Sequence, residues 1–178
     1  LGENIVVTPY DVTYDGSAHT ATGSVTGFLG EDLSAGLDLT GTTHTDADTY
    51  EEDSWIFTDT TGNYENASGT VDDYIGKANI SEGINITPYS VTYDGYSHTA
   101  TGSVTGVLGE DLSAGLDLTG TTHTNANTYN EDPWTFTDTT GNYEDANGTV
   151  DDIIDPKPIT VTADPQTKVF GEPDPLPF

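Results

Sequence analysis

The chain has no cysteine, methionine or arginine and only three lysines among its 178 residues. Without cysteine there is neither a disulfide framework nor a thiolate site. No apolar run is long enough to span a membrane as a helix, and no basic region followed by an apolar stretch marks a signal peptide. The formal net charge of −28 repels nucleic acid and anionic membrane surfaces. We therefore expect no nucleic-acid partner and no membrane insertion.

Threonine dominates what is present, with 32 residues, while apolar residues make up only 33% of the chain. Thr, Val, Ile and Tyr suit a pleated, half-buried surface, and Gly, Asn and Asp suit turns. No stretch combines helical spacing with helix caps. The composition therefore predicts an all-β protein with thin cores rather than one thick core.

An internal repeat organises the chain. VTPYDVTYDG, from Val7, returns as ITPYSVTYDG, from Ile86, and the repeat continues without a gap for 69 positions, of which 56 are identical. The period of about 79 residues is too long for a solenoid coil and long enough for each copy to bury a small core. Because the chain begins without Met and ends within a pattern, we expect a piece of a longer array. The repeat predicts two modules, residues 1–77 and 78–156, and residues 157–178 as the start of a third repeat of another subtype.

Short alternating segments indicate the strands of each module. In the first copy they are Ile5–Val7, Val12–Tyr14, His19–Thr26, Leu37–Leu39, Thr49–Tyr50, Trp55–Thr58 and Gly69–Ile75, separated by Gly, Asn or Asp. We interpret the acidic residues between Thr49–Tyr50 and Trp55–Thr58 as a turn. About seven short strands in such a length are typical of an antiparallel immunoglobulin-like sandwich. We expect Trp55 and Trp134 to anchor the cores, and Tyr64 and Tyr143 to brace a corner before the last strand.

Paired acids near the end of each copy are the candidate metal ligands. Asp72 and Asp73, with Asp151 and Asp152 in the second copy, lie close to the junction that follows each module. Calcium requires several oxygen ligands at close range, although no EF-hand-type loop is present. The alternative is a solvated, charged strand edge that prevents aggregation. The sequence thus offers a candidate calcium site at the module junctions.

Four sequons offer candidate sites for covalent glycans. They begin at Asn66, Asn79, Asn85 and Asn147, near turns and junctions. The histidines occur as HT dipeptides without the spacing of a metal site, so we interpret them as strand-surface residues. No serine nucleophile elbow, phosphate-binding loop or zinc motif is present, and we expect no enzymatic activity.

Several segments, taken in order, resemble the MBG-type bacterial immunoglobulin-like repeats. These are YDG near the start, TATGSVTG, GTTHT, the W-x-FTDTTGNY stretch and the closing SGTVDDYI, and the final ITVTADPQTKVFGEPDP resembles the opening of another subtype. The resemblance implies tandem β-sandwich modules in large secreted or surface-anchored bacterial proteins, used as adhesin stalks or matrix components. It implies no catalytic residue.

These observations together lead to a leading expectation and two alternatives. We expect a non-enzymatic extracellular structural array, the stalk or fibre of a cell-surface adhesin-like protein, whose partners are neighbouring repeats of the same chain. In the first alternative, identical chains assemble into a filament by β-strand addition, with Ile159–Ala163 as the donated strand. In the second, the modules bind carbohydrate through Trp55 or Trp134.

Overall fold

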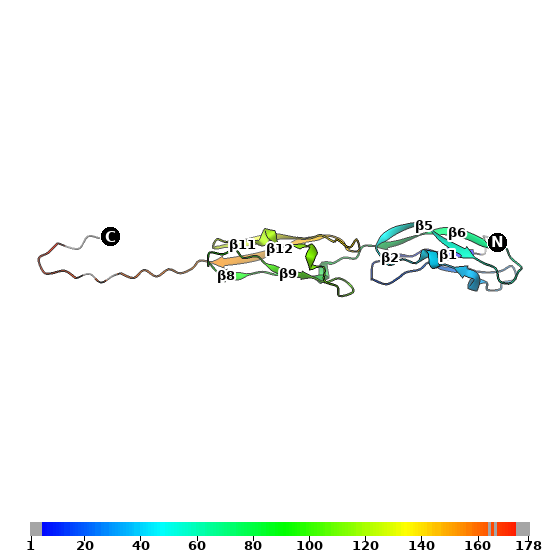
Figure 1. Cartoon of the computed structure of the whole chain (residues 1–178), viewed down its shortest axis with the longest axis horizontal. Helices are drawn as coiled ribbons and strands as arrows, with labels where there is room; N and C mark the ends of the chain where they lie inside the picture. The colour runs from blue at the N-terminus through cyan, green and yellow to red at the C-terminus, as the bar shows by residue number, and fades with distance from the viewer. Residues whose placement is uncertain (1–4, 164, 166, 174–178) are drawn as a thin grey trace.

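The computed structural model describes residues 5–163, 165 and 167–173, and they form two similar units placed end to end (Figure 1). We call residues 1–77 the first unit and residues 78–156 the second unit. Every regular element in the described residues is a strand or a short 3-10 turn, so the chain is all-β as its composition predicts. Residues 156–163 leave the second unit as extended chain without strand pairing.

The first unit has a four-stranded sheet and a two-stranded sheet. The larger sheet has the order β2-β6-β5-β4, in which β2 runs parallel to β6 and the other pairs are antiparallel. The smaller sheet pairs β1 with β3. The opening segment therefore contributes to both sheets, changing at Pro9, which cannot donate a ladder hydrogen bond. The strand bounds are β1 Ile5–Thr8, β2 Asp11–Thr13, β3 Thr22–Val25, β4 Leu37–Asp38, β5 Asp48–Phe57 and β6 Ala67–Gly76, with 3-10 turns η2 Ser34–Gly36 and η3 Thr40–Thr42.

The second unit repeats this plan. Its sheets have the orders β10-β11-β12-β8 and β7-β9, with β8 parallel to β12. The strands are β7 Ile84–Thr87, β8 Ser90–Thr92, β9 Thr101–Val104, β10 Leu116–Asp117, β11 Asn127–Phe136 and β12 Ala146–Asp155, with 3-10 turns η4 Ser81–Gly83, η5 Ser113–Gly115 and η6 Thr119–Thr121.

One predicted turn is wrong. The segments expected as a pair, Thr49–Tyr50 and Trp55–Thr58, belong to the single strand β5, whose register shifts between Tyr50 and Asp53. The intervening acidic residues form a β-bulge in which Glu52 has a φ of 58°. The N–H of Glu52 donates to the carboxylate of Asp72 on β6 at 2.9 Å, which holds the bulge in place.

Each unit has a thin core built from aliphatic and aromatic side chains. Phe57 and Phe136 are each only 1% exposed, and Val25 and Val104 fill the equivalent positions of the smaller sheets. The buried hydroxyls of Thr42 and Thr121 accept the N–H groups of Ala21 and Ala100, which ties the core to the loop before β5 or β11. One apolar cluster joins the units, because it contains Tyr14 and Ile75 of the first unit together with Val104 and Tyr143 of the second.

Candidate functional site

The two units meet at a contact that combines hydrogen bonds with apolar packing, and it begins with a very short linker. β6 ends at Gly76, whose carbonyl accepts the N–H of Tyr14 at 2.8 Å. On the other side, the N–H of Ala78 donates to the carbonyl of Asn142 at 2.9 Å, and the N–H of Glu144 donates to the carbonyl of Ala78 at 3.0 Å. Lys77 alone lies between these held residues, so the linker backbone has little freedom to bend.

Asn142 joins the units through its side chain. Its Oδ1 accepts the N–H of Ala47 at 2.7 Å, and its Nδ2 donates to Asp46 at 3.2 Å. Asn142 is buried, and its side-chain oxygen and nitrogen each have a partner across the contact. Asp46 and Ala47 come just before β5. An isolated parallel bridge between Ala78 and Tyr143 holds the loop that carries Asn142.

Two tyrosines form the apolar part of the contact. The rings of Tyr14 and Tyr143 meet edge to face, with centroids 5.5 Å apart and planes at 79°. The hydroxyl of Tyr143 donates to Glu110 and accepts the N–H of Val107 at 2.9 Å. Burial, and then the hydrogen bond to Glu110, raises the pKa of Tyr143 to about 12. Tyr143 therefore ties the loop at Val107 and Glu110 to the segment before β12, and its ring also closes the contact.

Gly16 makes room for the second unit. It has a φ of 77°, and a Cβ at this position would lie 2.5 Å from the side chain of Leu108. Leu108 belongs to the loop after β9, so this loop rests directly on the Asp-Gly turn of the first unit. Only glycine combines the left-handed backbone with this close approach.

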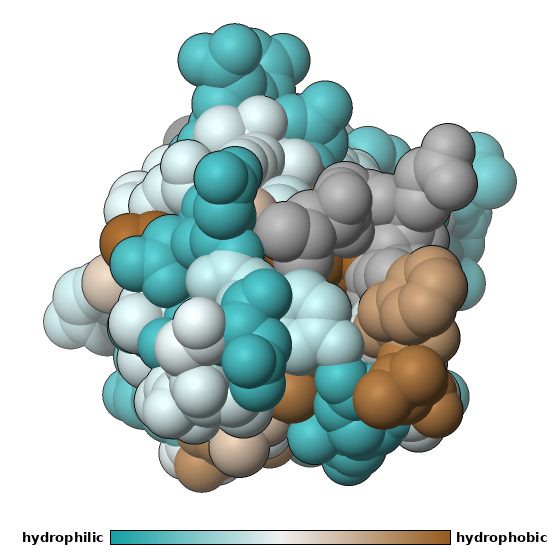
Figure 2. All heavy atoms as spheres, turned by 90° about the vertical axis from the view of Figure 1, so that its right-hand side faces the viewer, coloured by the Kyte–Doolittle hydropathy of each residue, from teal (hydrophilic) through white to brown (hydrophobic). Residues whose placement is uncertain are grey.

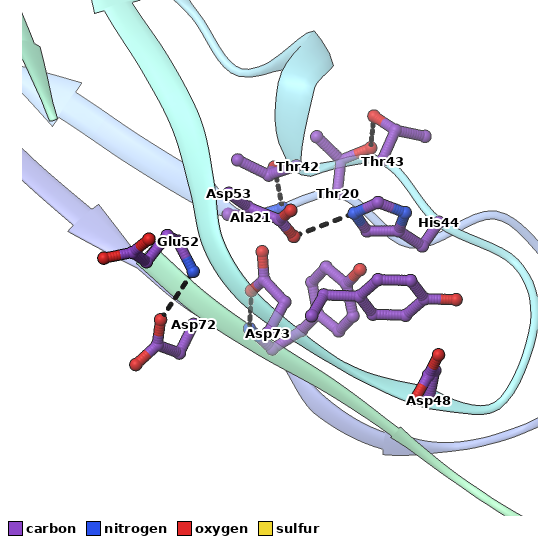
Figure 3. A network of polar contacts seen from close by, with 12 residues as sticks. Thr20, Ala21, Thr42, Thr43, His44, Asp48, Glu52, Asp53, Asp72 and Asp73 are labelled. Carbon is purple, nitrogen blue, oxygen red and sulfur yellow. Dashed lines mark hydrogen bonds and ion pairs between the residues drawn. The ribbon is translucent and has the colours of Figure 1, made fainter. Parts of the chain in front are cut away.

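The aspartate pairs do not form the joint metal site that the sequence suggested. Successive strand residues point to opposite faces, so Asp72 is exposed and binds the Glu52 N–H while Asp73 is buried (Figure 3). Asp151 and Asp152 repeat this arrangement with Glu131 and Tyr89. Within the described residues there is no group of three or more His, Cys, Asp or Glu side chains suited to a metal ion.

Asp73 holds the opening segment of the first unit against β6. Its Oδ1 accepts the N–H of Tyr10 at 2.9 Å, while its Oδ2 is buried without a partner, and Asp152 shows the same pattern. Burial raises the pKa of the Asp73 carboxyl, and Asp53 raises it further. The folded state therefore binds this proton more tightly than the unfolded chain does, and the stability that this adds is lost as pH rises above the unfolded pKa near 4.

His44 is half-buried in a polar cluster beside Asp73, rather than lying on a strand surface as its HT dipeptide suggested. His44 Nε2 lies 2.8 Å from Asp53 Oδ2, and the His44 ring stacks on Tyr50 with centroids 3.6 Å apart (Figure 3). His123, Asp132 and Tyr129 repeat the cluster in the second unit. His44 also pairs with His19 in a backbone bridge that closes the loop before β5. His44 and Asp53 are nine residues apart and meet because the chain turns back on itself before β5. Their spacing alone does not predict this contact.

The tryptophans are half-buried rather than enclosed. Trp55 lies flat on its strand neighbour Gly69, where a Cβ would be 2.4 Å from the ring. The fully buried aromatic position that we expected for Trp55 and Trp134 is taken by Phe57 and Phe136 instead. The alternation resumed after the bulge puts Trp55 and Phe57 on one face, but only Phe57 reaches its centre. Trp134 lines a groove with Ile84, Ile86, Asn147 and Val150.

The sequon asparagines all lie on the surface. Asn66 and Asn79 accept nearby backbone N–H groups in turns, while Asn85 and Asn147 lie on strands β7 and β12. Tyr64, the fourth expected anchor, is only partly buried, although its hydroxyl contacts Glu31 and accepts the N–H of Phe28 as Tyr143 does in the second unit.

Comparisons with known proteins identify no family. The chain matches no family model, and the search of curated proteins finds no relative. None of the helices in the described residues is long and apolar enough to cross a membrane.

Proposed function

We propose that this chain is part of a non-enzymatic, extracellular structural array, the stalk or fibre of a cell-surface adhesin-like protein. The contact between the units is the observation that carries the proposal. A one-residue linker, the Asn142 amide and the Tyr14–Tyr143 pair hold two similar units in line (Figure 1). Repeats joined in this way add length with little loss of stiffness.

In this proposal each unit is an immunoglobulin-like sandwich of the MBG type. Two packed sheets per unit and an opening segment shared between the sheets support it. The charge of −28 keeps such an array soluble and separated from other chains, and glycans at the exposed sequons would add to this separation.

Small-angle scattering and surface labelling test the two parts of the proposal. We expect a monomeric rod two units long, whose maximum dimension stays the same when calcium is replaced by chelator. Antibodies against the chain should label intact cells of the producing organism, and external protease should remove the signal. A bent or broad ensemble would contradict the stalk, and labelling that requires cell lysis would contradict the extracellular location.

A filament built by strand addition is the second candidate, and the exposed C-terminal segment favours it. Ile159 and Val161 are 88% and 89% exposed in an extended segment that pairs with no strand. An alternating apolar segment of this kind is suited to adding to a sheet edge. Deletion of residues 157–178 should then abolish assembly, and assembly that survives the deletion removes this candidate.

One observation supports carbohydrate binding as an alternative, namely the groove lined by Trp134. Sugar stacking on the indole should change its fluorescence. Titration with a panel of soluble glycans, with Trp134→Phe as control, tests this, and unchanged fluorescence across the panel removes the alternative.

A further inference from the structure

In the part of the chain that the structure describes, the last strand of the second unit has a long edge without a partner strand. β12 runs over Ala146–Asp155 and pairs with β11 along most of this length. On its other side, β8 covers only Ile153–Asp155. The nearby strand β7 belongs to the separate two-stranded sheet with β9. The second unit is therefore open between β7 and β12, and we call residues 146–152 of β12 the free edge.

The register of β12 directs backbone hydrogen-bonding groups outward along the free edge. In an antiparallel pair, the N–H and C=O groups of alternate residues point toward the partner strand and away from it. The N–H of Ile153 points away from β11, because it donates to the carbonyl of Tyr89 at 3.0 Å. Thr149 and Asn147 lie four and six residues earlier, and β12 carries no extra residue between them. Their backbone groups therefore also point outward, where an extended peptide can pair with them.

An apolar groove lies beside the free edge. Ile84, Ile86, Trp134 and Val150 line it, and its volume of about 390 Å³ is typical of a binding cleft. Successive residues of a strand face opposite sides of its sheet. Every second side chain of a strand added to β12 would therefore enter the groove. The groove favours a peptide with an apolar residue at every second position.

An extended peptide suits this groove better than a sugar does. The Trp134 ring lies flat on Gly148, where a Cβ would be 2.4 Å from the ring. The chain itself thus covers one face of the indole and leaves at most one face for stacking. The outward backbone groups, by contrast, repeat at every second residue, which is the pattern that a peptide backbone matches.

The charges around the groove indicate a basic partner. No lysine or arginine occurs between residues 78 and 155. Exposed acids adjoin the residues that line the groove in the sequence, namely Glu82, Asp145 and Asp151. These carboxylates attract lysine and arginine side chains of an occupant and repel acidic ones. The acids that protect the free edge from like-charged chains therefore favour a basic strand.

A second copy of this chain is a poor occupant for the same reason. Two copies that each carry −28 repel one another. Figure 2 looks onto the outer end of the first unit, where hydrophilic and neutral residues make up most of the coloured surface. The occupant is therefore expected to be a different protein.

We propose that the free edge of β12 and its groove bind an extended, basic peptide segment of another protein by β-strand addition. The peptide backbone pairs with Asn147 and Thr149, and its alternate apolar side chains enter the groove. The lysine or arginine side chains between them lie on the side of the sheet where Asp151 is exposed. The proposal goes beyond the stalk and does not depend on it, because the free edge belongs to the second unit itself.

Titration with synthetic peptides tests the site, with the NMR signals of the Asn147 and Thr149 amides as a readout specific to the second unit. The probe has seven residues that alternate valine with lysine, to match the length of the free edge. We expect saturable binding that slows hydrogen exchange of both amides at least about tenfold. A matched peptide that alternates valine with glutamate should bind at least tenfold more weakly. Equal binding of the two peptides overturns the basic partner, and unchanged signals with both overturn the site.

Two changes separate strand pairing from attraction between charges. Thr149→Pro removes an outward N–H that Thr149→Ala keeps, and proline is tolerated on edge strands. Measured at Asn147, the proline variant should lose at least tenfold in affinity and the alanine variant less than twofold, with unchanged circular dichroism spectra. A valine–lysine peptide methylated at every backbone nitrogen keeps its charge and leaves the protein unaltered. It should not bind, and retained binding overturns strand addition.

Other occupants of the groove give different results. A soluble glycan that shifts the Asn147 amide, when the valine–lysine peptide does not, assigns the groove to sugar and overturns the proposal. Self-association of the chain that Thr149→Pro removes assigns the free edge to a second copy, with the same consequence. Failure of the peptide to bind leaves the rod expected of a stalk unchanged, so the two proposals fail separately.

Discussion

Tyr143 and Tyr64 occupy equivalent positions in the two copies of the repeat, but they differ in what surrounds them. Each hydroxyl contacts a glutamate and accepts a loop N–H, from Val107 in one case and Phe28 in the other. Yet Tyr143 is fully buried and Tyr64 is not. The difference comes from the first unit, whose Tyr14 packs on Tyr143 of the second. The burial of such a residue depends on its neighbouring unit as well as on its own fold.

Replacing each of the two tyrosines by alanine should give the largest difference in the free energy of unfolding. We expect Tyr143→Ala to lower the free energy of unfolding by about 3 kcal/mol or more, because it leaves a cavity in the cluster shared by both units. Tyr64→Ala should cost clearly less. Denaturant unfolding followed by tryptophan fluorescence measures both, and equal losses would mean that the contact adds nothing to Tyr143.

Glycine substitutions at Gly16 and Gly95 sharpen the same comparison. Both residues have positive φ values, of 77° and 88°, so alanine should cost about 1 kcal/mol at either position. Only Gly16 faces Leu108. We therefore expect Gly16→Ala to cost about 1–2 kcal/mol more and to broaden the scattering profile of the rod. Equal midpoints of thermal unfolding for the two variants would contradict this.

Replacing asparagine by alanine should give a smaller difference in stability between the contact, at Asn142, and the outer end of the first unit, at Asn63. Asn142→Ala removes two hydrogen bonds across the contact and leaves the Ala47 N–H unsatisfied, at a cost of about 1–2 kcal/mol. Asn63→Ala removes an exposed side chain and should be close to neutral. A neutral Asn142→Ala variant would show that water replaces the amide without loss.

The smallest expected effect is a change in stability at high pH, and it comes from the titration of Tyr143 alone. Because the pKa of Tyr143 is raised to about 12, its protonated form stabilises the fold below pH 10 and this stability is lost as pH rises through 12. Ultraviolet titration of the native protein and of Tyr143→Phe gives the difference spectrum of this one tyrosine. A midpoint near 10 would show that Tyr143 is open to solvent.

The sequence predicts the units but not the contact between them. The repeat predicts a boundary after Lys77, and in the structure β6 ends at Gly76. Strand alternation predicts most strands of each unit. The acidic residues Glu51 and Glu52 predict a turn, but they form a β-bulge, and a run of charged residues is compatible with either structure. Asp73 contacts Tyr10, and His44 contacts Asp53, only once the sheet has folded. The identical segments Asp59–Glu65 and Asp138–Glu144 carry no information about which of the two tyrosines is covered.

Amide hydrogen exchange by NMR tests the central claim, that the two units are locked together by a built contact. The N–H of Ala47 donates to Asn142, whereas the equivalent N–H of Ala126 has no partner among the described residues. We predict that Ala47 exchanges at least about tenfold more slowly than Ala126 at a protein concentration low enough to keep the chain monomeric. Equally fast exchange at the two positions would show that the units move independently, and would contradict the claim.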